Sequence, residues 1–108
     1  MGTERKLKRF WKIEGYDSTQ KVFQAVLPLG SLSEGEMTTL LQRLVAAHLT
    51  SDEIVRASLR RNSKSYAALL EPQQEGSPPA KRFYISVGHD KHYVASVWKA
   101  DELEAVSA

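Results

Sequence analysis

The segment from residue 33 to residue 48 constrains the fold most, because two independent patterns mark it as helical. Ser33 followed three residues later by Glu36 matches the capping box, in which each side chain accepts a hydrogen bond from the other residue's backbone amide. Apolar residues then recur at the spacing of one helix face: Met37, Leu40, Leu41, Leu44 and Val45, with His48 on the same stripe. The segment is therefore predicted to be a helix that lies on a hydrophobic core.

A second capping-box pattern follows, formed by Thr50 and Glu53. It predicts a shorter helix over 51–61, turned away from the first near Leu49. Val55, Ala57 and Leu59 also alternate, however, so a strand paired with 65–70 across a turn at 62–63 is the competing interpretation. The capping pattern favours the helix.

Residues typical of β-strands occur on both sides of these helices. The strands are expected at 10–16, 21–29, 66–71, 82–87 and 92–99. The segment 72–80 (PQQEGSPPA) contains three prolines and a glycine, so a mobile loop is expected there. We therefore predict an α+β fold, with an antiparallel sheet of about five strands in the order ββααβββ and the helices packed on one face. The alternative order is ββαββββ.

The 108 residues are expected to form a single globular domain. It would carry a basic N-terminal arm (1–9), the mobile loop (72–80) and an acidic C-terminal tail (101–108). The chain has no cysteine, which excludes disulfides and thiolate chemistry. No apolar run reaches the length of a membrane span and no signal-peptide core follows the N-terminus, so we expect a cytoplasmic protein with no membrane partner.

Positive charge is concentrated in two stretches. Nine of the fifteen Lys and Arg residues lie in 5–12 and 56–64, whereas the formal net charge of the chain is only +2. Clustered bases can neutralise phosphates, so nucleic-acid binding is one functional hypothesis. Its candidate contacts are Lys6, Lys8, Arg9, Arg56, Arg60 and Lys64, with Arg56, Arg60 and Lys64 forming one stripe if the second helix reaches them.

The last two strands suggest a different surface. Residues 88–91 are predicted to form a hairpin turn. A two-residue loop there would place Tyr84, Tyr93 and Val97 on the same face of the sheet. Tyrosine beside apolar residues is favoured at protein interfaces. These three residues are therefore the candidates for a partner surface, with a protein partner or a homodimer as the expected occupant.

The residues that most resemble a metal or catalytic cluster are His89, Asp90 and His92. A zinc site would need further ligands that the sequence does not supply, and a turn accounts for Gly and Asp here. No phosphate-binding loop, dinucleotide fingerprint or metalloprotease motif is present. We therefore expect a small non-enzymatic binding or regulatory module without a cofactor. Nucleic-acid binding is the first alternative, and an enzyme or metal protein using the histidine cluster is the second.

Overall fold

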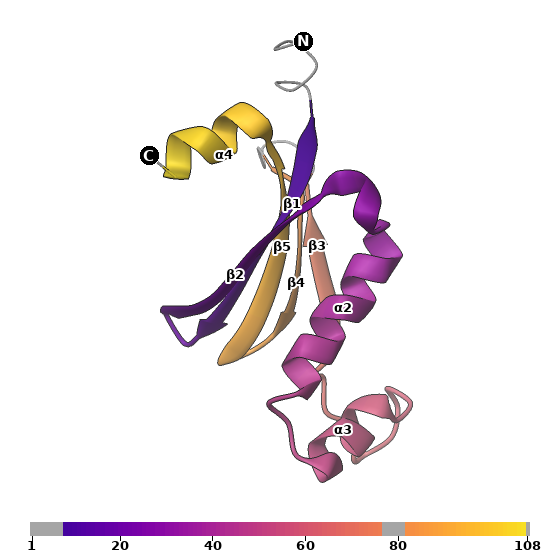
Figure 1. The fold of residues 1–108 in the computed structure, drawn as a ribbon. Helices are drawn as coiled ribbons and strands as arrows, with labels where there is room; N and C mark the ends of the chain where they lie inside the picture. Colours follow the sequence, from indigo (N-terminus) through magenta and orange to yellow (C-terminus); the bar gives the residue numbers. More distant parts are fainter. Residues whose placement is uncertain (1–7, 77–81, 108) are drawn as a thin grey trace.

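The computed structural model describes residues 8–76 and 82–107 and has an α+β fold, as predicted. Five antiparallel strands form one sheet in the order β2-β1-β5-β4-β3 (Figure 1). In chain order the elements are β1 (Arg9–Asp17), β2 (Gln20–Pro28), the 3-10 turn η1 (Leu29–Ser31), α2 (Glu34–Ala46), α3 (Ser51–Ser58), β3 (Pro72–Glu75), β4 (Tyr84–Gly88), β5 (Lys91–Lys99) and α4 (Ala100–Ser107). The predicted order ββααβββ is confirmed, with α4 added at its end.

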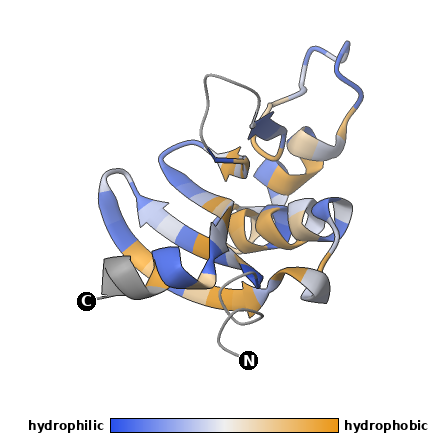
Figure 2. Cartoon of the chain, turned by 90° about the horizontal axis from the view of Figure 1, so that it is seen from above, coloured by the Kyte–Doolittle hydropathy of each residue, from blue (hydrophilic) through white to orange (hydrophobic). Residues whose placement is uncertain are grey.

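Helix α2 covers one face of the sheet, and its start has the expected capping box. Glu36 N donates to Ser33 Oγ at 3.1 Å, and Ser33 N donates to Glu36 Oε1 at 3.0 Å. Apolar residues gather where α2 crosses the strands (Figure 2). The fully buried members of this core include Trp11, Ile13, Met37, Leu41, Ile85 and Val87.

The segment after Thr50 is helical, so the competing strand interpretation is wrong. Glu53 N donates to Thr50 Oγ1 at 3.2 Å and Thr50 N donates to Glu53 Oε1 at 2.9 Å. Helix α3 ends at Ser58 rather than at residue 61, because Leu59 is extended and Ala67 N from the returning chain donates to the carbonyl of Arg56. The helix lies beyond the end of the sheet (Figure 1), in a molecule measuring 55 × 26 × 25 Å.

Two expectations for the middle of the chain are wrong. Residues 66–71 have no regular secondary structure instead of forming a strand, and Gln42 Nε2 of α2 donates to the Leu70 carbonyl at 2.9 Å. The strand comes later, because β3 occupies the first residues of the expected loop 72–80. Proline is compatible with this position, since β3 is an edge strand and Pro72 is its first residue. Residues 77–80 of that loop lie outside the described residues.

The register of the β4–β5 hairpin differs from the expected one by one residue. Gly88 pairs with His92 and Val87 with Tyr93, so three residues, not two, separate the paired ends. Gly88 has a φ of +108°, and a Cβ atom there would stand 2.4 Å from the Lys91 carbonyl oxygen. A shift of one residue moves every side chain of a strand to the opposite face, so the face assignments along β5 are reversed.

Candidate functional site

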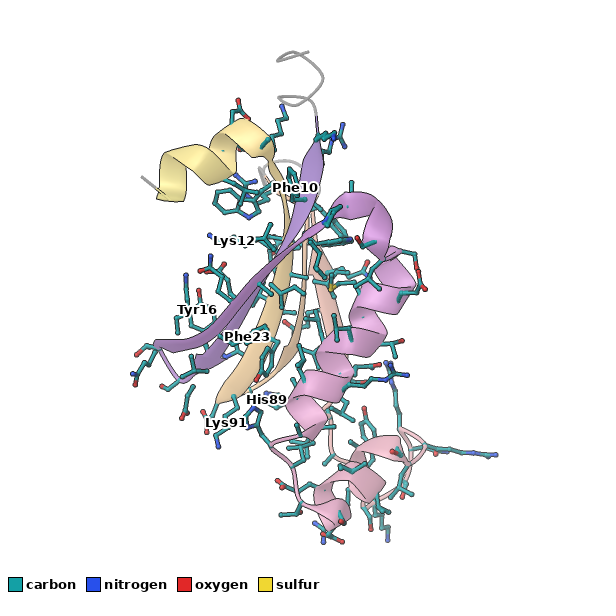
Figure 3. The ribbon with its side chains drawn as sticks, in the orientation of Figure 1. Phe10, Lys12, Tyr16, Phe23, His89 and Lys91 are labelled. Atoms are coloured by element: carbon teal, nitrogen blue, oxygen red, sulfur yellow. The ribbon has the colours of Figure 1, made fainter. Side chains whose placement is uncertain are left out.

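The face of the sheet opposite α2 is the candidate functional surface. Among the described residues no helix packs across it, and α4 turns toward that side at one end (Figure 1). We call this surface the bare face. Strand pairing places on it Phe10, Lys12, Glu14 and Tyr16 of β1, Gln24 and Val26 of β2, Tyr84 and Ser86 of β4, and His92, Val94, Ser96 and Trp98 of β5. Figure 3 labels three of them: Phe10, Lys12 and Tyr16.

Lys12 and Trp98 form the centre of a polar cluster on the bare face. Lys12 is only 5% exposed, and its Nζ lies 4.4 Å from the centroid of the Trp98 ring. The guanidinium carbon of Arg82 lies 3.8 Å from the same centroid. Trp98 Nε1 donates to the hydroxyl of buried Ser96 at 2.7 Å. Both cations are thus held against the electron-rich ring, a contact that strengthens when water is excluded.

Arg82 also connects the sheet to α4. Its guanidinium donates two hydrogen bonds to the Glu102 carboxylate, at 2.9 and 3.3 Å, and a third to the Val97 carbonyl at 2.7 Å. Lys99 N donates to Glu102 Oε1 at 2.8 Å. The bonds from Arg82 and from Lys99 N lower the pKa of Glu102 from 4.5 to about 2. We call Lys12, Arg82, Ser96, Trp98 and Glu102 the Trp98 cluster.

This pKa predicts a specific pH response. The pKa of Glu102 is lower in the folded protein than in the unfolded chain. The Arg82–Glu102 ion pair therefore contributes its full stabilisation of the fold above a pH of about 4.5. That contribution is lost as the pH falls through about 2. Carbon-13 NMR of the side-chain carboxyls should therefore find Glu102 still ionised at pH 3. Arg82→Gln should move its titration upward toward 4.5, and a midpoint near 4.5 in the unaltered protein would mean that the pair does not form in solution.

A second charged group lies farther along the bare face. Glu14 Oε2 is 2.7 Å from Lys21 Nζ and 4.0 Å from Lys12 Nζ. Burial raises the pKa of the Glu14 carboxyl, but the hydrogen bond from Lys21 and the charge of Lys12 outweigh it, so this pKa lies below its usual value. Tyr16 donates to the same carboxylate at 3.1 Å, and its ring stacks on His92 with centroids 5.1 Å apart. The charges of this face are thus largely paired with one another.

The three residues expected to share a partner surface do not share a face. Tyr84 lies on the bare face, where its hydroxyl donates to Glu75 at 2.6 Å. Tyr93 and Val97 lie on the face covered by α2, because the hairpin register is shifted by one residue. Tyr93 is 7% exposed, and its hydroxyl lies 2.8 Å from Nε2 of His48. The predicted grouping of these three is therefore wrong.

The basic stretches do not form one surface. The first leads into β1 at one end of the molecule, and the second runs from the last turn of α3 into the loop after it, at the other end (Figure 1). Lys8 and Arg9 are exposed at the first end, while Lys6 lies outside the described residues. The expected stripe is also wrong, since α3 ends before Arg60 and Lys64.

Two arginines of the second stretch have acidic partners within the molecule. Arg56 Nε lies 3.0 Å from Asp52, one helical turn away, and Arg61 Nε lies 2.8 Å from Glu71. Exposed pairs of this kind contribute little stability, but they reduce the charge available to phosphates. The electrostatic support for a nucleic-acid surface is therefore weaker than the sequence suggested.

The histidine cluster forms hydrogen bonds to the backbone. His89 Nε2 donates to the Ala68 carbonyl, and His92 Nδ1 donates to the His89 carbonyl, each at 2.9 Å. Within residues 8–76 and 82–107 no group of three or more His, Asp or Glu side chains is arranged to hold a metal ion. These bonds give both rings a structural role in the turn.

The Trp98 cluster is not predicted by the sequence patterns described above. Arg82 and Glu102 are 20 residues apart, and Lys12 meets Trp98 only because β1 pairs with β5. The available signal was the alternation of Phe10, Lys12 and Glu14 against Trp11 and Ile13, which places a charged face opposite an apolar one.

Comparisons of the chain with protein-family models, with curated proteins and with solved structures give no match. Of the helices that the structure describes, none combines the length and apolar character that crossing a membrane requires.

Proposed function

We propose that this chain is a small non-enzymatic binding module that docks a protein on its bare face, and that the docked protein is a second copy of the same chain. The observation that carries the proposal is a sheet face on which aromatic residues surround charges already paired with one another. Such a face can be removed from water at lower cost than one with unpaired charges.

The composition of the face supports a protein partner. Aromatic residues and arginine are enriched at protein interfaces, and the bare face carries Phe10, Tyr16, Tyr84, Trp98 and Arg82. On the neighbouring edge strand, Val26 is 44% exposed directly beside Lys12. The apolar surface thus continues to the edge of the sheet.

The charges of the face favour a second copy over a nucleic acid. Acidic and basic side chains occur there in equal number: Lys12, Lys21 and Arg82 against Glu14, Glu75 and Glu102. A two-fold interface brings the same patch together from both copies, so it requires a surface that is complementary to itself. A phosphate backbone would instead require an excess of positive charge.

The size of the face is at the lower end of the range for a dimer. Strands of these lengths, spaced about 4.8 Å apart and rising about 3.3 Å per residue, present roughly 600 Å² on one face. Each partner in a standard interface contributes about 800 Å². The bare face together with the adjoining end of α4 approaches that area.

Lys12 provides a further reason to expect a protein partner on the bare face. Its side chain is only 6% exposed and its carboxylate partner is 4.0 Å away. Since every buried side-chain nitrogen or oxygen of the described residues has a hydrogen-bond partner and Lys12 Nζ has none, the ammonium group keeps contact with water, which a partner would displace. A buried cation is stabilised when additional hydrogen bonds satisfy its donors. A carboxylate or carbonyl oxygen of the second copy would supply such an acceptor.

The test is the mass of the protein in solution, measured by sedimentation over a range of concentrations. We expect a dimer for the unaltered chain. Val26→Glu places a charge at the edge of the proposed interface and should weaken the dimer by about 100-fold or more. The matched control is Val55→Glu on α3, where the side chain is 58% exposed and lies outside the bare face.

Either of two outcomes would overturn the proposal. The unaltered chain could be monomeric at all concentrations, or Val55→Glu could dissociate the dimer while Val26→Glu does not. Circular dichroism of each variant establishes that the fold is retained. Titration of labelled duplex DNA and RNA in the same series tests the nucleic-acid alternative, for which tight binding that weakens steeply with salt is the required sign.

A further inference from the structure

A cleft of about 570 Å³ lies at the end of the sheet where β1 begins and β5 ends. It forms because β4 starts only at Tyr84, opposite Ser96, so the last residues of β5 extend beyond their β4 partners. Trp11, Leu29, Leu32, Phe83 and Val97 provide its apolar walls. Its volume is typical of sites that bind small organic molecules.

The rim of this cleft carries two like charges side by side. Arg9 and Lys99 are directly opposite each other in the β1–β5 pairing, and both are exposed. Directly opposed residues have Cβ atoms roughly 5 Å apart, and like charges there repel. Strand alternation places both on the same face as Trp11 and Val97.

The other charged residues of the cleft limit what can bind. Arg82 is held by Glu102, so its charge is already compensated. Glu34, the first residue of α2, lies on the wall formed by the start of that helix. It would repel a second negative charge on a ligand, whereas a single anionic group near Arg9 and Lys99 would relieve their repulsion.

We propose that this cleft binds a small amphiphilic organic acid with one carboxylate and an acyl or aryl body. The body packs against Leu32, Phe83 and Val97, and the carboxylate lies between Arg9 and Lys99. Charge-assisted hydrogen bonds from these two bases fix the orientation of the ligand. The body lies on the α2 side of the sheet, but the cleft also reaches Arg82, Trp98 and Glu102 of the Trp98 cluster, so it adjoins the dimer interface proposed above.

The chain supplies its own probe for the test, since its two tryptophans, Trp11 and Trp98, both line the cleft. Sodium octanoate, which does not absorb where tryptophan is excited, is titrated while the intrinsic fluorescence is recorded. Octanol and octylammonium serve as the neutral and cationic controls with the same body. We expect a saturable change with octanoate, at an affinity at least about tenfold higher than with octanol, and weaker binding still of octylammonium.

Charge variants identify the site. The double variant Arg9→Gln/Lys99→Gln should bind octanoate no more tightly than octanol. The matched control is Lys91→Gln, which removes a charge from the opposite end of β5 and should leave octanoate binding unchanged. No saturable change, equal binding of octanoate and octanol, or an equal loss in Lys91→Gln would overturn the proposal. Because Trp98 also lies in the proposed dimer interface, the mass of the protein is measured at the same octanoate concentrations, so that a fluorescence change caused by dissociation is distinguished from binding in the cleft.

Discussion

Leu41→Ala is expected to lower the free energy of unfolding by about 3 kcal/mol. Leu41 is fully buried in the core that α2 forms with the sheet. The substitution loses the transfer free energy of the missing atoms and leaves a cavity that a close-packed interior fills only in part. For a chain of this length the melting temperature should fall by roughly 10–15 °C. Urea unfolding followed by circular dichroism measures the change.

The matched control for Leu41→Ala is Val55→Ala, in an α3 side chain that is 58% exposed. That variant should change the stability by less than about 0.5 kcal/mol, since little apolar surface is returned to water. A loss below about 1 kcal/mol in Leu41→Ala would contradict the packing of α2 on the sheet. An equal loss in both variants would mean that α3 is packed in solution more closely than this structure shows.

Gly88→Ala is the second large effect, with an expected loss of about 2 to 4 kcal/mol. The φ of +108° at Gly88 is unfavourable for any residue with a side chain. The added Cβ would also stand 2.4 Å from the Lys91 carbonyl oxygen and 2.9 Å from His92 Cα, and backbone atoms cannot rotate away. Thermal unfolding of the purified variant gives the loss directly.

Gly35→Ala is the control for Gly88→Ala, because a Cβ at Gly35 has no neighbour within 4 Å. Gly35 lies in the first turn of α2, where alanine restricts the unfolded chain and favours the helix. The free energy of unfolding of Gly35→Ala should be unchanged or higher by up to about 1 kcal/mol. If the two glycine variants behave alike, the hairpin does not have the conformation described for Gly88.

The effect of Gly88 bears on function as well as on stability. The register that it permits places Val94, Ser96 and Trp98 on the bare face and leaves Tyr93 in the core. In the register expected from the sequence, Tyr93 would have been exposed and Trp98 covered by the helices. A Gly88→Ala variant that folds in the other register would therefore lose the Trp98 cluster, and with it the proposed dimer interface.

The sequence determined the features that depend on residues close to one another along the chain. Both capping boxes join residues three apart, and the buried stripe of α2 repeats every three or four residues, so each could be recognised without knowing the rest of the structure. The alternation in β1 and β5, and hence the α+β class and the element order, follows from the same local periodicity.

The tertiary structure alone decided where α3 ends, which part of 66–75 becomes a strand, and how the last hairpin is paired. Each depends on a contact between distant residues: the Arg56 carbonyl with Ala67, the Leu70 carbonyl with Gln42, and β1 with β5. The Trp98 cluster arises in the same way, from Lys12, Arg82 and Glu102 brought to one ring by strand pairing and α4. The conformational preferences of residues extend over only a few positions along the chain. The bare face, in contrast, is formed by strands whose register is fixed across the whole sheet.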